Sequence, residues 1–177
     1  MPFFARLRRL AVPLAASLAL PCAAIAAAAT PSQAGDVAPV YVGETVKGER
    51  VELGKYAGQA VVISFWATWC PYCLKELPIL HGIQKAAKGK VHVIAINTED
   101  RKTFHKVAGI LRELEIEMTY DPDETAREAY GVNGIPHLVV IGRDGRIVNV
   151  FRGYGESSLN SIVEAINLAT GAVRSAD

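Results

Sequence analysis

Apolar and polar residues follow two different periods along the chain, and together they predict alternating strands and helices. Short, β-branched apolar runs at 60–65 and 91–97 predict buried strands. Between them, apolar residues recur every three to four positions, which predicts an amphipathic helix from Cys70 to Ala87. A helix between two buried strands implies parallel strands joined by a right-handed crossover. The pattern therefore predicts an α/β domain.

Antiparallel hairpins are predicted before and after this unit. Residues 40–46 and 50–53 alternate in hydropathy around a polar turn. Residues 138–141 and 147–151 form a second pair, and the Asp-Gly sequence between them is a common hairpin turn. We therefore expect a mixed sheet that contains both parallel and antiparallel strands.

Helical periodicity returns in the middle and at the end of the chain. An apolar stripe from Phe104 to Leu114 predicts a second helix, followed by a short strand near 118–121 and a short helix over 123–130. A final helix is predicted by the apolar positions within 159–168. The chain thus supplies helices for both faces of the sheet.

The first 34 residues differ in composition from the rest. Three arginines precede an almost wholly apolar run from Leu10 to Ala29, which ends in small residues. This is the pattern of an export signal. We expect 1–34 to be a signal peptide and 35–177 to be one domain in the periplasm or another extracytoplasmic compartment. An uncleaved membrane anchor is the alternative, because about twenty apolar residues are enough to span a bilayer.

The remaining composition is that of one ordinary globular domain. Small-residue cleavage motifs occur at 26–28 and 32–34, and we place the cut near Ala34. Removing 1–34 takes away three of 19 basic residues and none of 18 acidic ones, which leaves 16 against 18 and a net charge near −2. No basic run is interleaved with aromatic residues, so nothing indicates nucleic-acid binding. We expect a monomer.

The mature chain holds a single cysteine pair, Cys70 and Cys73, because Cys22 lies in the signal. Such a pair can be a redox couple, a structural disulfide or half of a zinc site. The sequence has no second cysteine pair and no histidine pair at ligand spacing. A structural bridge closing so small a loop would restrict the unfolded chain little. The redox interpretation is therefore favoured, with no metal and no cofactor beyond the two thiols.

The position of Cys70 at a helix N-terminus predicts its reactivity. Pro71 suits the first helical position, where a missing N–H costs no hydrogen bond. Unpaired N–H groups and the helix dipole stabilise a thiolate there, so the pKa of Cys70 should lie below the free-thiol value of about 8.5. We expect Cys70 to be the reachable nucleophile and Cys73, one turn further along, to be covered and to resolve the mixed disulfide.

The sequence FWATWCPYC, followed by LKELP, resembles the active site of TlpA/ResA-like thiol:disulfide oxidoreductases of the thioredoxin superfamily. The resemblance covers about 40–170 and implies a thioredoxin-like fold: a mixed central sheet flanked by helices, an N-terminal β-hairpin and a central insertion over about 98–130. Two details depart from thioredoxins. Pro71-Tyr72 is the dipeptide typical of glutaredoxins, and Ser64 stands where thioredoxins carry a buried aspartate.

The same resemblance assigns a substrate-binding surface. The segment Gly134-Ile135-Pro136 resembles the family's cis-proline loop, which faces the dithiol and presents backbone groups to an extended substrate chain. Trp66 is then a core residue and Trp69 a partly exposed flank of the site. The residues expected to contact substrate are Trp69, Pro71, Tyr72, Ile135 and His137, with Pro136 counted among the catalytic residues.

Two further residues each have more than one interpretation. Glu76 lies three residues after Cys73, on the same face of the helix. If buried, Glu76 would have a raised pKa and could take the proton of Cys73; otherwise it is a solvated helix residue. His137 is most simply an exposed residue at the start of a strand. It could also stabilise a thiolate, or complete a copper site with Cys70 and Cys73.

The predicted function is reduction of protein disulfides. The Cys70 thiolate attacks a substrate disulfide, and Cys73 then releases the reduced substrate, leaving an oxidised Cys70–Cys73 pair. By analogy with the family, a membrane thiol-electron donor re-reduces the pair, and the clients act in cytochrome c or copper-site maturation. The alternatives are a disulfide-forming oxidase, or a copper-binding chaperone that uses Cys70, Cys73 and His137.

Overall fold

A computed structural model describes residues 31–153, 155 and 158–172, so residues 1–30 of the predicted signal peptide lie outside the described chain. Its described strands form a single seven-stranded sheet in the order β2-β1-β5-β4-β3-β6-β7. They are β1 (Tyr41–Glu44), β2 (Arg50–Glu52), β3 (Ala60–Trp66), β4 (Val91–Asn97), β5 (Glu117–Tyr120), β6 (His137–Ile141) and β7 (Ile147–Arg152).

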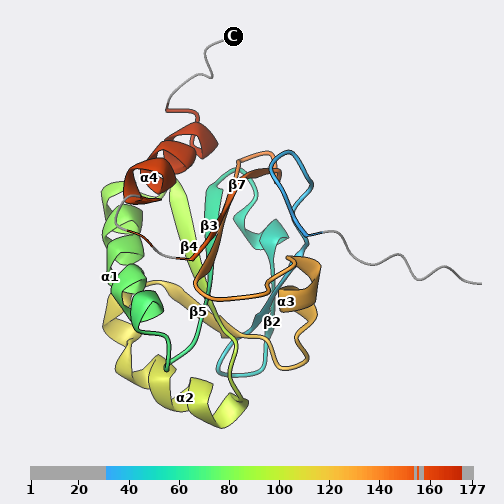
Figure 1. Cartoon of the computed structure of the whole chain (residues 1–177), viewed down its shortest axis with the longest axis vertical. Helices are drawn as coiled ribbons and strands as arrows, with labels where there is room; N and C mark the ends of the chain where they lie inside the picture. The colour runs from blue at the N-terminus through green and yellow to red at the C-terminus, as the bar shows by residue number, and fades with distance from the viewer. Residues whose placement is uncertain (1–30, 154, 156–157, 173–177) are drawn as a thin grey trace, which may run out of the picture.

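Helices cover both faces of this sheet (Figure 1). They are α1 (Pro71–Ala86), α2 (Arg101–Ile110), α3 (Thr125–Ala129) and α4 (Ser158–Ala169), with short 3-10 helices at Leu53–Tyr56 and Arg112–Leu114. Helices α1 and α4 lie on one face, α3 lies on the other, and α2 crosses one end of the molecule. The result is the layered α/β architecture that the sequence predicts.

The pairing of the strands confirms the predicted mixed sheet. Strand β4 pairs in parallel with both β3 and β5, whereas β6 pairs antiparallel with β3 and β7. The predicted N-terminal hairpin is present as β1 and β2, and β1 also pairs antiparallel with β5. The central insertion therefore supplies β5, and β5 is the strand through which the hairpin joins the main sheet.

The alternation of side chains along β3 divides the core into two layers. Val62 and Trp66 pack toward α1 and α4 in a cluster that contains both Cys70 and Cys73. Ile63 and Phe65 pack toward α3 in a second cluster. Full burial of one such side chain stabilises the fold by about 1.5–3 kcal/mol. Because neighbouring residues of a strand point to opposite faces, the parity of a position decides whether it can reach the cysteines.

One predicted helix is shorter in the structure. The apolar stripe from Phe104 to Leu114 predicts a continuous helix, but α2 ends at Ile110 and a separate 3-10 turn follows. Gly109 lowers helix propensity in the last turn. Leu111 and Leu114 still pack against the core cluster, so the apolar period continues although the regular helix does not.

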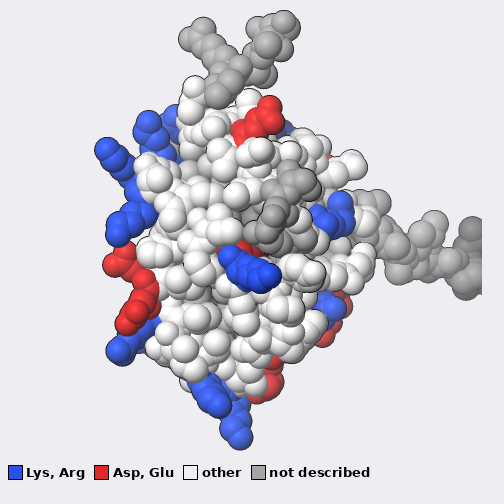
Figure 2. Space-filling view, turned by 60° about the vertical axis from the view of Figure 1, so that its left-hand side comes forward, with Lys and Arg blue, Asp and Glu red and all other residues white. Residues whose placement is uncertain are grey.

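The surface over α1 and α4 carries charges of both signs. Figure 2 turns this side forward and shows Lys and Arg interspersed with Asp and Glu along its edge, and further charged side chains near the centre of an otherwise largely uncharged area. No continuous basic surface occupies this face. Among the described residues, no helix has the length and apolar character needed to cross a bilayer.

Candidate active site

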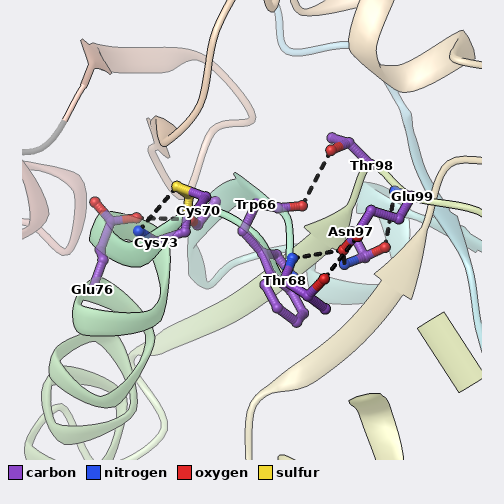
Figure 3. The surroundings of a disulfide bond; sticks show 9 residues. Trp66, Thr68, Cys70, Cys73, Glu76, Asn97, Thr98 and Glu99 are labelled. Atoms are coloured by element: carbon purple, nitrogen blue, oxygen red, sulfur yellow. Dashed lines mark hydrogen bonds between the residues drawn. A yellow bond between two sulfur atoms is a disulfide. The ribbon is translucent and has the colours of Figure 1, made fainter. Parts of the chain in front are cut away.

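A disulfide joins Cys70 and Cys73 where the chain leaves β3 and enters α1 (Figure 3). The two Cα atoms lie 5.3 Å apart. Cys70 is the N-cap of the helix, with extended backbone angles, and its Sγ accepts a hydrogen bond from the Cys73 N–H at 3.2 Å. Pro71 occupies the first helical position. The sulfur of Cys70 therefore lies where helix N–H groups stabilise negative charge.

The two cysteines differ in exposure. Cys73 is fully buried, and Cys70 retains 4% of its surface, which is less than we expected for a reachable nucleophile. Two residues near Cys70 in the sequence are exposed to solvent: Trp69 is 70% exposed and Tyr72 is 55% exposed. Of the two cysteines, Cys70 is therefore the one that retains exposed surface, and it lies between exposed side chains.

Glu76 lies under the disulfide on the same face of α1 and is 3% exposed, so the solvated interpretation is wrong. Its Oε2 accepts a hydrogen bond of 2.7 Å from the hydroxyl of Ser64 in β3. Burial raises the pKa of Glu76, and the hydrogen bond from Ser64 partly opposes that rise. The carboxyl group can therefore hold a proton at a higher pH than a surface glutamate does.

Pro136 follows a cis peptide bond from Ile135, as the family resemblance implies. It lies immediately before β6, whose His137 pairs with Phe65 of β3. This register places Pro136 beside the end of β3 from which the chain runs to Cys70. Ile135 is half-buried and packs against the cluster that contains the cysteines. The loop and the disulfide thus occupy the same end of the sheet.

The position of His137 corrects the sequence analysis, because this residue is 1% exposed and not a surface histidine. Its ring packs edge-on against Phe65 at 5.9 Å, in the layer that faces α3. The cysteines lie in the opposite layer, so the sheet separates them from the imidazole. A copper site of Cys70, Cys73 and His137 is contradicted, and the described residues contain no group of three potential metal ligands.

Burial of His137 predicts a pH-dependent stability. Burial, with a smaller effect from Arg152, lowers the pKa of His137 from 6.5 to about 4, and its Nε2 has no hydrogen-bond partner among the described residues. The unfolded chain therefore takes up a proton at a higher pH than the folded chain does. Stability should fall as the pH drops from 6.5 to about 4.

Urea unfolding at pH 7.5 and pH 4.5 tests this expectation. We expect His137→Phe, which keeps an aromatic ring against Phe65, to lose less stability than the wild type between the two pH values. The partly exposed His105 provides the matched control, because His105→Gln should follow the wild-type curve. Equal pH dependence in His137→Phe and wild type would contradict the prediction.

A polar network that the sequence analysis did not identify holds the loop before Cys70. The carboxylate of Glu99 accepts hydrogen bonds from the Thr68 N–H at 2.6 Å, the Thr68 hydroxyl at 2.7 Å and the Asn97 amide at 3.2 Å. Glu99 follows the end of β4, and Asn97 is fully buried. The sequence does offer a signal for this network, because Asn97 and Glu99 are polar residues at the carboxyl end of β4. The carboxyl ends of parallel strands lie at the same edge of a sheet, so these residues could be expected near the end of β3.

A Cys-X-X-Cys disulfide at the start of a helix, on a sheet with a cis-proline loop at the same end, defines a thiol:disulfide oxidoreductase of the thioredoxin fold. The chain belongs to the Redoxin family, whose model matches residues 33–166. It is 32% identical to the thiol-disulfide oxidoreductase ResA of Bacillus subtilis (strain 168) over 124 residues, which is 67% of each chain. Identity to ResA of Bacillus anthracis is 30% over 126 residues, covering 68% of this chain and 70% of that one.

Solved structures of other thiol:disulfide exchange proteins have the same fold. The thioredoxin domain of a thiol-disulfide oxidoreductase from Bacteroides vulgatus matches with a TM-score of 0.64 and 27% identity, over 76% of this chain and 98% of that one. A thiol:disulfide interchange protein from Chlorobium tepidum matches with a TM-score of 0.62 and 25% identity, over 81% of this chain and 99% of that one. The predicted fold and the predicted class of enzyme are therefore confirmed.

Proposed function

We propose that this protein reduces disulfide bonds in other proteins outside the cytoplasm. The observation that carries the proposal is the placement of the two cysteines: Cys70 is the N-cap of α1 and retains 4% of its surface, whereas Cys73, inside the helix, is fully buried. In the proposed reaction, the Cys70 sulfur meets the partner and the Cys73 sulfur completes the exchange.

The reaction balances without a further cofactor. The Cys70 thiolate attacks one sulfur of a substrate disulfide, which forms a mixed disulfide and releases the other substrate sulfur as a thiolate. Cys73 then loses its proton to the Glu76 carboxylate and attacks Cys70, which releases the second substrate sulfur. The substrate gains two electrons; its two thiolates take up the proton that Glu76 received and one proton from water, and the protein is left with the Cys70–Cys73 disulfide. A membrane thiol-electron donor would restore the dithiol.

The exposed residues beside Cys70 support a protein substrate. Trp69, Pro71 and Tyr72 are exposed around the buried sulfurs and provide apolar contact area. Backbone groups of Ile135, in the loop that ends at Pro136, would pair with an extended segment of the substrate. Backbone pairing discriminates weakly among sequences. We propose client proteins of cytochrome c or copper-site maturation on the basis of family resemblance.

Equilibration in glutathione buffers tests the direction of electron flow. The Pro71-Tyr72 dipeptide, shared with glutaredoxins, leads us to expect a reduction potential of about −200 to −230 mV. Acid quenching, alkylation and mass spectrometry at each glutathione ratio would give the midpoint. A midpoint near −120 mV, the value of strong thiol oxidants, would overturn the reductase assignment and support a disulfide-forming oxidase.

Export is the second part of the proposal. The basic and apolar pattern of residues 1–34 supports it. Ser32 is buried, and its hydroxyl donates to the Ala129 carbonyl at 3.2 Å, which favours the cleavage motif at 26–28 over the one at 32–34. The intact mass of the protein recovered from an extracytoplasmic fraction would identify the processed terminus, and recovery only from the cytoplasm would contradict export.

A further inference from the structure

The turn that leads to Cys70 and the helix is held in part by a side chain from another element, the carboxylate of Glu99. The Cys70 N–H donates to the Ala67 carbonyl at 3.2 Å and closes a turn over residues 67–70. The N–H of Thr68, inside the turn, instead donates to the carboxylate of Glu99 at 2.6 Å. The hydroxyl of Thr68 donates to the other oxygen of the same carboxylate at 2.7 Å. Glu99 therefore accepts hydrogen bonds from both donors of Thr68.

The carboxylate is itself anchored to the sheet (Figure 3). Asn97 donates its amide to Glu99 at 3.2 Å, and the Glu99 N–H donates back to the Asn97 side chain at 2.9 Å. Asn97 is fully buried and pairs with Trp66 across β3 and β4. The N–H of Thr98 also donates to the Trp66 carbonyl at 3.0 Å. The end of β4 thus provides a fixed support for the segment between β3 and α1.

We propose that Glu99 is a positioning residue for the dithiol, acting through Thr68 to hold Cys70 at the N-cap of α1. Hydrogen bonds to an ionised acceptor are stronger and shorter than neutral ones, and Glu99 accepts three from fixed donors. Without them, the turn over 67–70 would sample other conformations and the Cys70 sulfur would spend less time against the helix N–H groups. The thiolate of Cys70 would then be less stable, and Cys70 would react more slowly at neutral pH.

The test measures the pH dependence of Cys70 alkylation by iodoacetamide in the reduced full-length protein. In Glu99→Gln, we expect the pKa of Cys70 to rise by half a unit to one unit, so that alkylation at pH 7 is about threefold to tenfold slower. The rate on the alkaline plateau should be unchanged, because full ionisation removes the difference. Thr68→Val, which keeps the N–H and the shape, should show a smaller change in the same direction.

Two comparisons separate positioning from general destabilisation. The double variant Thr68→Val/Glu99→Gln should be no slower than Glu99→Gln alone, because both changes act through one contact. Glu113→Gln, on an exposed glutamate, should match the wild type. An unchanged alkylation profile in Glu99→Gln would overturn the proposal. So would a lower pKa of Cys70, because it would mean that Glu99 acts through its charge and not through the turn.

Discussion

Replacing Cys73 with serine is expected to trap the protein in a mixed disulfide with its substrate, whereas replacing Cys70 with serine should leave no trapped species. Cys73→Ser keeps the sulfur at the helix N-cap, so the first attack remains possible. It removes the fully buried sulfur that would release the substrate. Turnover with a protein disulfide should fall by about 10³-fold or more in both variants, because each removes a group that participates in bond making.

Non-reducing electrophoresis after incubation with a protein disulfide distinguishes the two variants. Cys73→Ser should give a band of higher mass that dithiothreitol removes, and peptide mass spectrometry should place the bond at Cys70. Cys70→Ser is the matched control, since it retains one thiol on the same helix. Equal trapping by Cys70→Ser would show that Cys73 is reachable and would reverse the assigned order of attack.

Glu76→Gln is expected to slow the resolving step by about 10²-fold, the lower end of what general acid–base catalysis contributes. The amide has the size of the carboxyl group but cannot accept a proton from Cys73. In the wild type, the resolving rate should rise as the pH passes through the pKa of Glu76, and this rise should be absent in the variant. Stopped-flow measurement of substrate release from a preformed mixed disulfide would isolate the step.

Ser64→Ala is the companion variant for this prediction. The Ser64 hydroxyl donates to Glu76 and lowers the pKa of the carboxyl group, so its removal should raise that pKa further. The pH at which resolution accelerates should therefore move upward while the maximal rate is retained. An unchanged pH profile in both Glu76→Gln and Ser64→Ala would mean that Cys73 passes its proton elsewhere.

Relative to the wild type, Glu76→Gln should gain stability as the pH rises, whereas His137→Phe should gain stability as the pH falls. The folded-state pKa of Glu76 is raised, so the stability associated with its protonated form is present below the unfolded pKa and is lost as the pH rises through the folded value. The free energy of unfolding of the variant, compared with that of the wild type, should therefore increase as the pH rises from 4.5 to 8. Urea unfolding of the oxidised protein measures this difference, with Glu113→Gln as the control.

Local sequence was sufficient to predict the strands and helices near the site and the position of the Cys70–Cys73 pair. The apolar run before Phe65 predicts β3 because β-branched residues fit a pleated and buried strand. Pro71 after Cys70 predicts a helix start at the disulfide because proline lacks the N–H that a helix N-terminus leaves unpaired. The position of Cys70 between strand and helix is therefore a property of neighbouring residues alone.

The packing of the layers lay beyond local sequence. The helical period alone did not decide whether Glu76 faces solvent or the sheet. Ser64 in β3 is its hydrogen-bond partner because α1 packs on the sheet. His137 adjoins the cis-proline loop, but its register opposite Phe65 placed its ring in the layer away from the cysteines. Neighbours in sequence on a strand point to opposite faces, so closeness along the chain did not bring His137 near the disulfide.

The sequence by itself determined where the dithiol lies and which of its sulfurs begins the helix, because both depend on residues within a few positions of Cys70. Only the tertiary structure decided which groups surround that dithiol. Ser64 and Glu99 lie 12 and 31 residues away from the side chains they bond, Glu76 and Thr68. Such contacts form when separate strands and helices pack together, so a local pattern of hydropathy does not predict them.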